Sequence, residues 1–250
     1  MYPSEYQRLF ENEQHHWWFC ARRAIARALL DHYLPPARGR RRILDAGCGT
    51  GGNLALLRRY GRVVGLDLSP LALSLAHTRT TTGVTLTLGS LLAVPCADET
   101  FHLVTAFDVL YHQWVVDDVA ALVELRRVLK PGGLLLVTDS AWRRLRSGHD
   151  EINLARERYE VPELRARLHR AGFEPLRVSY ANSLLLPLIL AIRAARRLTA
   201  RGWEWPRSDV APVPAPLNKL LYGVYRSEAA LLPYVNLPRG SSVVAIARRR

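Results

Sequence analysis

The chain is poor in cysteine and in lysine. Its 250 residues include three cysteines, Cys20, Cys48 and Cys96, and two lysines, Lys130 and Lys219. The cysteines form neither a paired cluster of the kind that binds zinc nor a disulfide framework. We therefore predict a protein of the reducing cytoplasm that holds no metal ion.

Long apolar runs are also missing, and we expect no leader sequence. The first six residues lack the basic and apolar parts of a signal peptide. Residues 184–192 are locally membrane-like, but a spanning helix needs roughly twenty apolar residues. Arginines follow this run at positions 193, 196, 197 and 201. Two interpretations stay open: a helix packed on the core, or a basic interfacial helix that contacts anionic lipid or admits a lipid-linked substrate.

The net charge of +13 raises the question of nucleic-acid binding. Nearly all the positive charge is arginine, which together with abundant alanine and leucine is typical of a GC-rich genome. The arginines are spread along the chain apart from short runs, and no basic strip interleaved with aromatic residues is present. We therefore favour a small-molecule partner over a nucleic acid, and the oligomeric state cannot be predicted from the sequence.

The strongest functional signal lies in residues 42–67. An apolar strand is followed by Gly47, Gly49 and Gly51, which let the backbone turn tightly and approach a ligand. A short helical pattern comes next, and a second apolar run ends at Asp67. This succession is half of a nucleotide-binding unit, and the carboxylate is placed to accept hydrogen bonds from two ribose hydroxyls.

The glycine loop is compatible with more than one nucleotide. Gly47, Gly49 and Gly52 also satisfy the G-x-G-x-x-G pattern of dinucleotide-binding proteins, whereas no Gly-Lys-Ser/Thr follows as in a P-loop. Asp45 weighs against a dinucleotide, because a negative charge at the mouth of the loop would repel a pyrophosphate. The same charge suits S-adenosylmethionine, which carries a sulfonium and an ammonium. Its single carboxylate can still use the loop N–H groups and the positive helix end.

Four segments, in this order, resemble the motifs of the class I S-adenosylmethionine-dependent methyltransferases. They are the first motif at 44–51, the ribose-binding motif at 65–69, the fourth-strand segment at 98–112 and the fifth-strand segment at 125–137. The segment His-Trp-Trp-Phe at 16–19, followed by Arg22 and Arg23, resembles a subgroup whose members often accompany glycan or natural-product genes.

The resemblance implies an α/β fold with a Rossmann-like, seven-stranded, mostly parallel sheet whose last two strands form a partly antiparallel edge. We expect an N-terminal helical lid (1–39), a methyltransferase core (40–182), a helical cap insertion between the last two strands (183–236), and the last strand with a tail (237–250). Periodicity predicts helices over 22–33, 53–59, 70–80 and 162–171, and one begun by Asp117 or Asp118. Strands are predicted at 84–88, 102–108, 134–138, 174–180 and 242–247.

The resemblance also implies which residues meet the cofactor. Asp67 would bind the ribose, Leu68 would flank the adenine, and the Leu91 backbone would contact the ring. Ser90 stands where the family often has an aspartate, so its contact with the adenine amino group would be weaker. The full set of cofactor candidates is Asp45, Gly47, Gly49, Gly51, Asp67, Leu68, Ser90, Leu91, Phe107, Trp18 and Arg22.

Three residues are candidates for acid–base chemistry. His112 follows the fourth strand, where it would act as a general base near neutral pH or hydrogen-bond locally and shape the pocket. His149 and Asp150 would pair as a base and its orienting carboxylate, or belong to a polar loop that closes over the cofactor.

The sequence therefore predicts methyl transfer from S-adenosylmethionine to a small molecule, natural-product or sugar-like, at oxygen. Direct in-line displacement needs mainly positioning, because the sulfonium is a good leaving group. The alternatives are an RNA or protein methyltransferase, a non-catalytic cofactor-binding module and an NAD-dependent oxidoreductase. No Asn-Pro-Pro-Tyr-like motif follows the fourth strand, which weakens methylation of planar nitrogens.

Overall fold

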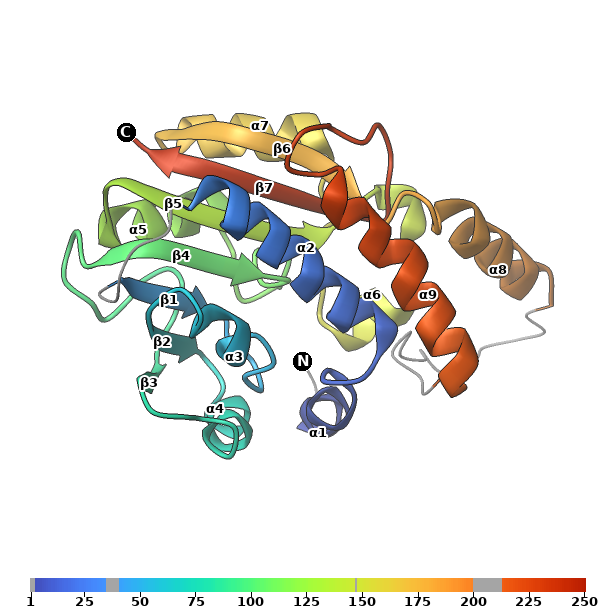
Figure 1. Cartoon of the computed structure of the whole chain (residues 1–250), viewed down its shortest axis with the longest axis horizontal. Coiled ribbons are helices and arrows are strands. Elements are labelled where there is room, and N and C mark those ends of the chain that lie inside the picture. Colours follow the sequence, from blue (N-terminus) through green and yellow to red (C-terminus); the bar gives the residue numbers. More distant parts are fainter. Residues whose placement is uncertain (1–2, 35–40, 147, 200–212) are drawn as a thin grey trace.

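A computed structural model describes residues 3–34, 41–146, 148–199 and 213–250. Seven strands form one sheet in the order β3-β2-β1-β4-β5-β7-β6 (Figure 1). The first five are parallel, and β7 runs antiparallel to both β5 and β6. This confirms the predicted Rossmann-like sheet and its antiparallel edge. The strands are β1 (Arg42–Ala46), β2 (Arg62–Asp67), β3 (Val84–Leu88), β4 (Phe101–Phe107), β5 (Leu129–Ser140), β6 (Phe173–Ala181) and β7 (Ser242–Arg249).

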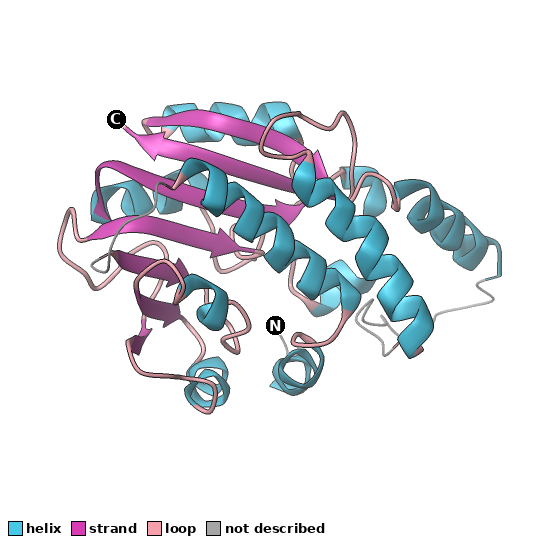
Figure 2. Cartoon of the chain, in the orientation of Figure 1, coloured by secondary structure: helices cyan, strands magenta, loops and turns pink. Residues whose placement is uncertain are grey.

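Helices cover both faces of the sheet (Figure 2). One face packs against α2 (Trp17–Tyr33), α3 (Leu54–Leu57) and α9 (Ala215–Ser227), and α2 and α9 lie side by side. The other face packs against α5 (Asp118–Val128) and α7 (Val161–Arg170). The remaining helices are α1 (Pro3–Asn12), α4 (Pro70–His77), α6 (Gly148–Ile152), α8 (Leu186–Thr199) and the short 3-10 turns Arg143–Leu145 and Glu228–Ala230.

Two helix starts follow from side-chain capping. The Ser69 hydroxyl accepts a hydrogen bond from the Ala72 amide, and Pro70 occupies the first turn of α4, as the sequence predicts. Of the two candidates for the cap of α5, Asp117 and Asp118, the structure shows that Asp117 is the cap, because its side chain accepts a hydrogen bond from the Ala120 amide.

The buried face of α5 differs from the prediction. The spacing of Val119, Leu122 and Val123 predicts that they share one apolar face of this helix, but Val123 is 50% exposed. The buried stripe instead contains Ala121, Leu122, Leu125 and Val128. Counted from the buried Asp118 as position i, Ala121, Leu122 and Leu125 lie at i+3, i+4 and i+7 of one helix face, and Val123 lies outside that face.

Several element boundaries also differ. His16 caps α2, which therefore starts at Trp17 rather than at Arg22. β5 begins at Leu129, before the predicted start, because Leu129 pairs with Phe101 ahead of an irregularity in the register. α3 and α4 are shorter than the predicted helices at 53–59 and 70–80.

The segments that were expected to form a lid and a cap both contain helices. α1 and α2 belong to the expected lid, and α8 and α9 lie between β6 and β7 in the chain. Residues 35–39 of the lid, residues 200–212 of the cap, and the side chains of Arg196 and Arg197 lie outside the described part of the structure. Among the described helices, none is long and apolar enough to cross a membrane. The four domain boundaries remain predictions.

Candidate active site

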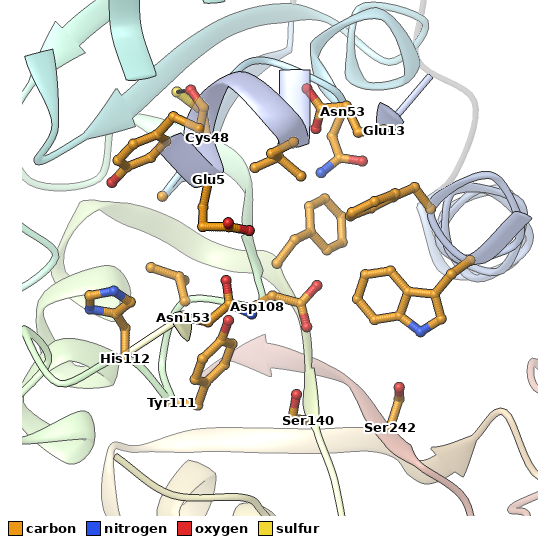
Figure 3. Close-up of a pocket in the computed structure, with 18 of the residues that line it drawn as sticks. Glu5, Glu13, Cys48, Asn53, Asp108, Tyr111, His112, Ser140, Asn153 and Ser242 are labelled. Atoms are coloured by element: carbon orange, nitrogen blue, oxygen red, sulfur yellow. Dashed lines mark hydrogen bonds between the residues drawn. The ribbon is translucent and has the colours of Figure 1, made fainter. Parts of the chain in front are cut away.

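A cavity of about 800 Å³ lies at the carboxyl ends of the parallel strands. Its walls come from the loop after β1, from the ends of β2, β4 and β5, and from α1 and α8. Figure 3 shows Glu5 of α1, Cys48 of the loop after β1, Asp108 after β4 and Ser140 of β5 around this shared space. This edge is where ligands bind in open α/β sheets.

The glycine loop after β1 forms one wall of the cavity. Gly47 has φ +78°, and a Cβ atom there would lie 2.5 Å from Cγ2 of Val109. Only glycine fits both constraints. The amides of Gly47 and Cys48 donate to the Leu66 carbonyl at 2.7 and 2.9 Å, which fixes the loop against β2.

Asp67 stands at the end of β2 and lines the cavity beside this loop. Its Oδ2 accepts from the Gly49 amide at 2.8 Å and its Oδ1 from the Ser69 amide at 2.9 Å. A carboxylate oxygen can accept two hydrogen bonds, so each oxygen keeps the capacity to accept from one ribose hydroxyl. Burial raises the pKa of Asp67 above its ordinary value, and the amide hydrogen bonds oppose that rise.

Asp45 lies beneath the loop rather than at its mouth, which corrects the prediction. Its side chain is 1% exposed and is not among the described residues that line the cavity. The Thr105 hydroxyl donates to Oδ1 at 2.7 Å, while Oδ2 is buried and accepts no hydrogen bond from the described residues. Burial, reinforced by the nearby Asp67 carboxylate, raises the pKa of Asp45 to about 7. Asp45 therefore carries only part of a negative charge at neutral pH.

Most of the other cofactor candidates do line the cavity. Leu68 is 49% exposed beside Asp67, as a residue that flanks an adenine would be. The Ser90 hydroxyl accepts from the Leu92 amide at 3.1 Å and keeps a second lone pair for another donor. Gly51 has φ +85° and shapes the loop from outside the cavity wall. The candidates that the structure brings together in the cavity are Trp18, Gly47, Gly49, Asp67, Leu68, Ser90, Leu91 and Phe107.

Arg22 makes an internal ion pair instead of lining the cavity. Its Nη1 lies 2.7 Å from Oδ1 of Asp108, and its Nη2 also hydrogen-bonds the Thr138 hydroxyl. The guanidinium lies 4.2 Å from the centre of the Trp18 ring. Arg22 therefore ties α2 to the ends of β4 and β5 and holds Asp108, which does line the cavity.

His112 lines the cavity in a partly buried position. Its Nδ1 accepts from the Trp114 amide at 3.3 Å, and its ring stacks on that of Trp114 with centroids 6.3 Å apart. Burial lowers the pKa of His112 to about 4. The imidazole is therefore neutral near pH 7. Because Nδ1 accepts from the Trp114 amide, the neutral ring carries its hydrogen on Nε2, and it can accept a proton only when Nδ1 leaves that amide.

The expected pair of His149 and Asp150 is only partly described. The His149 side chain lies outside the described part of the structure. Asp150 is buried and forms a two-point ion pair with Arg158, at 2.7 and 3.0 Å. Arg158 is the member of this ion pair that reaches the cavity.

A buried ion pair that the sequence did not reveal holds α1 over the glycine loop. Glu13 hydrogen-bonds the Thr50 hydroxyl and pairs with Arg79. The Arg79 guanidinium lies 3.8 Å from the centre of the Phe10 ring and donates to the Thr50 carbonyl at 3.2 Å. Glu13 and Arg79 are 66 residues apart in the chain, and no local sequence signal connects them.

The wall opposite the glycine loop mixes polar and apolar groups. Tyr111 and Asp108 point toward the same space, and the hydroxyls of Ser140 and Ser242 approach from β5 and β7 (Figure 3). Burial raises the pKa of Tyr111 well above its ordinary value, so its hydroxyl stays protonated and can donate. Ile189 of α8 adds an apolar surface. This side of the cavity can hold a second small molecule next to a nucleotide.

Comparisons with known proteins agree with this geometry. Residues 43–133 match the family model described as a methyltransferase domain. A malonyl-[acyl-carrier protein] O-methyltransferase of Erwinia pyrifoliae is 31% identical over 193 residues, covering 75% of this chain and 72% of that protein. Its Serratia marcescens counterpart is 42% identical over 100 residues, covering 40% of this chain and 38% of that protein. In several curated relatives the matched stretch is 34% to 38% of their own length.

Solved structures share the fold over nearly the whole chain. A putative methyltransferase of Haloferax volcanii, solved in a complex with the Trm112 methyltransferase activator, has a TM-score of 0.62 and 19% identity, and covers 98% of this chain and 93% of its own. With the motifs, the sheet order and the relatives agreeing, the chain belongs to the class I S-adenosylmethionine-dependent methyltransferases.

Proposed function

We propose that the protein transfers a methyl group from S-adenosylmethionine to an oxygen atom of a small natural-product or sugar-like acceptor. The observation that carries this proposal is the single cavity that joins the glycine loop and Asp67 to the wall containing Tyr111 and His112. When bound, S-adenosylmethionine supplies an electrophilic methyl group on a sulfonium. The backbone of Gly47 and Gly49, the Asp67 carboxylate, the Leu68 side chain and the Leu91 backbone would hold it.

The protein itself excludes water from the donor, orients the acceptor hydroxyl and provides a group that accepts its proton. α1, fixed by Glu13 and Arg79, covers the loop and keeps water from the donor side. The opposite wall orients the acceptor hydroxyl for in-line attack, and this positioning supplies much of the rate. The neutral His112 imidazole takes the hydroxyl proton on Nδ1, which gives up its hydrogen bond from the Trp114 amide in this step.

The names of the relatives support oxygen as the methylated atom. Besides the malonyl-[acyl-carrier protein] O-methyltransferases, a fatty-acid O-methyltransferase of Mycolicibacterium smegmatis is 30% identical over 149 residues, or 54% of this chain and 45% of that protein. Solved structures with less than 25% identity add support for the fold alone.

The test is turnover on a panel of hydroxylated small molecules with S-adenosylmethionine whose methyl group is isotopically labelled. We expect labelled product and S-adenosylhomocysteine in equal amounts for at least one acceptor. Tight binding of S-adenosylhomocysteine without turnover on any acceptor would instead indicate a non-catalytic module. If His112→Ala and His149→Ala both keep wild-type turnover at saturating cofactor, the assignment of a histidine base is wrong.

A further inference from the structure

On the basis of the proposed function, we infer that the acceptor is a polyhydroxylated, sugar-like molecule whose hydroxyl groups are bound by one polar wall of the cavity. This polar wall consists of five residues that line the cavity: Ser140, Arg158, Asn182, Ser241 and Ser242. They come from the ends of β5 and β6, from the start of β7, and from the segment between α6 and α7.

The register of the sheet places three of these residues side by side. Ser140 of β5 pairs with Ser242 of β7, and Ser242 pairs with Ala181 of β6, which directly precedes Asn182. The three positions lie at the carboxyl ends of the parallel strands, where ligands bind in open α/β sheets. Figure 3 shows the Ser140 and Ser242 hydroxyls pointing into the cavity. The sheet therefore presents a row of uncharged polar groups to the acceptor.

Arg158 supplies fixed hydrogen-bond donors whose charge is balanced. The residue is 6% exposed, its Nε and Nη2 donate to the two carboxylate oxygens of Asp150 at 2.7 and 3.0 Å, and its Nη1 donates to the Ala141 carbonyl at 3.0 Å. A guanidinium has five N–H donors, so these three bonds to described residues leave two for a ligand. The Asp150 carboxylate would repel a second anion, so the pair favours an uncharged oxygen.

Asn182 supplies a buried hydrogen-bond acceptor. The residue is 1% exposed, its Nδ2 donates to Oγ of Ser241 at 2.7 Å, and its backbone amide donates to the Glu228 carboxylate at 2.7 Å. Its Oδ1 is buried and accepts no hydrogen bond from the described residues. The Cβ–Cγ torsion of asparagine is soft, so a small rotation of the amide presents Oδ1 to the cavity. A ligand hydroxyl that donates to Oδ1 then makes a hydrogen bond that the protein alone lacks.

The polar wall as a whole requires a ligand that both donates and accepts hydrogen bonds. Arg158 needs an acceptor, Asn182 needs a donor, and each serine hydroxyl can take either role. A hydroxyl group satisfies all of them, whereas a carboxylate or a carbonyl only accepts and an ammonium only donates. Several hydroxyls on one ring match this wall, and a further hydroxyl of the same ring is the one that His112 deprotonates.

The test is the binding of phenyl glycosides to the full chain saturated with S-adenosylhomocysteine, measured by saturation-transfer NMR titration. The probes are the phenyl glucoside, galactoside and mannoside. Phenyl tetrahydropyranyl ether has the same rings without the hydroxyls, and phenyl glucuronide adds a carboxylate. We expect at least one glycoside to bind about tenfold or more tightly than the ether, because only the glycoside hydrogen-bonds the polar wall. The glucuronide should bind no more tightly than the glucoside.

Two variants remove the two halves of the hydrogen-bonding pattern. Arg158→Met combined with Asp150→Asn removes the guanidinium without leaving a buried charge unpaired. Asn182→Gly removes the amide, and glycine tolerates the φ of +58° at this position. Each variant should weaken glycoside binding by about tenfold and leave the affinity for the ether unchanged. Arg144→Met is the matched control, because Arg144 is exposed and is not among the described residues that line the cavity.

An ether that binds as tightly as every glycoside, or an unchanged glycoside affinity in both variants, overturns the proposal. Tighter binding of the glucuronide than of any uncharged glycoside also overturns it and indicates an anionic acceptor. Thermal melting and the heat of S-adenosylhomocysteine binding show that each variant is folded. The binding assay involves no methyl transfer, so a glycoside that binds through the polar wall but is never methylated contradicts the proposed function and not this inference.

Discussion

The ion pair between Arg22 and Asp108 gives the sharpest test of how α2 supports the site. Arg22→Met removes the cation and keeps much of the apolar stem. Asp108 then faces the buried Asp139 without a countercharge, and proximity to Asp108 already helps to raise the pKa of Asp139. Asp108 lines the cavity with φ +52°, so its release disturbs the site as well as the fold.

The expected loss of stability follows from the burial of the pair. Breaking a buried pair by removing one partner costs about 3–5 kcal/mol. The Asp108 side chain is 24% exposed and keeps some hydration, which favours the lower end of this range. For a chain of this length, about 3 kcal/mol corresponds to a fall of about 6 °C in Tm. Scanning calorimetry of the wild type and Arg22→Met measures this fall.

A second variant separates the ion pair from simple loss of packing. Arg22→Met combined with Asp108→Asn leaves no unpaired charge, so we expect it to recover about half of the lost Tm. A fall of less than about 2 °C in Arg22→Met would refute the reasoning. So would a double variant whose destabilisation is the sum of the two single ones.

Three further changes test other parts of the site. Because burial raises the pKa of Asp45 from 3.8 to about 7, the folded state binds its proton more tightly, and the stability this provides is lost as pH rises from about 4 to about 7. The Tm of Asp45→Asn minus that of the wild type should therefore increase between pH 5 and pH 8. A Tm difference that does not change with pH would contradict this. His112→Gln should lower kcat by about a hundredfold. Because the pKa of His112 is about 4, the ratio of wild-type to variant kcat should stay constant above about pH 5. An inflection of this ratio near pH 6.5 would contradict the prediction. Arg79→Met removes the partner that holds Glu13, the residue directly after α1. Calorimetry should then show S-adenosylhomocysteine binding about tenfold more weakly, and an unchanged Kd would mean that α1 does not help to retain the cofactor.

The sequence was informative where function depends on short, ordered segments of chain. The glycine loop, Asp67 at the end of β2 and the positions of the strands along the chain could be predicted, because each is encoded by residues next to one another in the chain. The sheet as a whole was expected only from the family resemblance. The cap of α4 could be predicted from Ser69 and Pro70 for the same reason.

The features that the sequence did not give depend on contacts between distant segments. Arg22 looked like a cofactor ligand, but its partner Asp108 is 86 residues away. Asp45 looked like a charge facing the ligand, but its burial beneath the loop depends on the packing of β1 against β4. The helical spacing placed Val123 on one face with Val119 and Leu122, yet the face that α5 buries is set by the sheet against which it packs.

The most direct test of the account is calorimetry of S-adenosylhomocysteine binding to the wild type, to Asp67→Asn and to Asp67→Ala, with NAD as the competing ligand. The account predicts a clear heat for the wild type, no heat with NAD, and affinities that fall stepwise, with Asp67→Ala weaker by about tenfold or more because its ribose acceptors are gone. Equal affinity in the wild type and Asp67→Ala, or tighter binding of NAD than of S-adenosylhomocysteine, would contradict it.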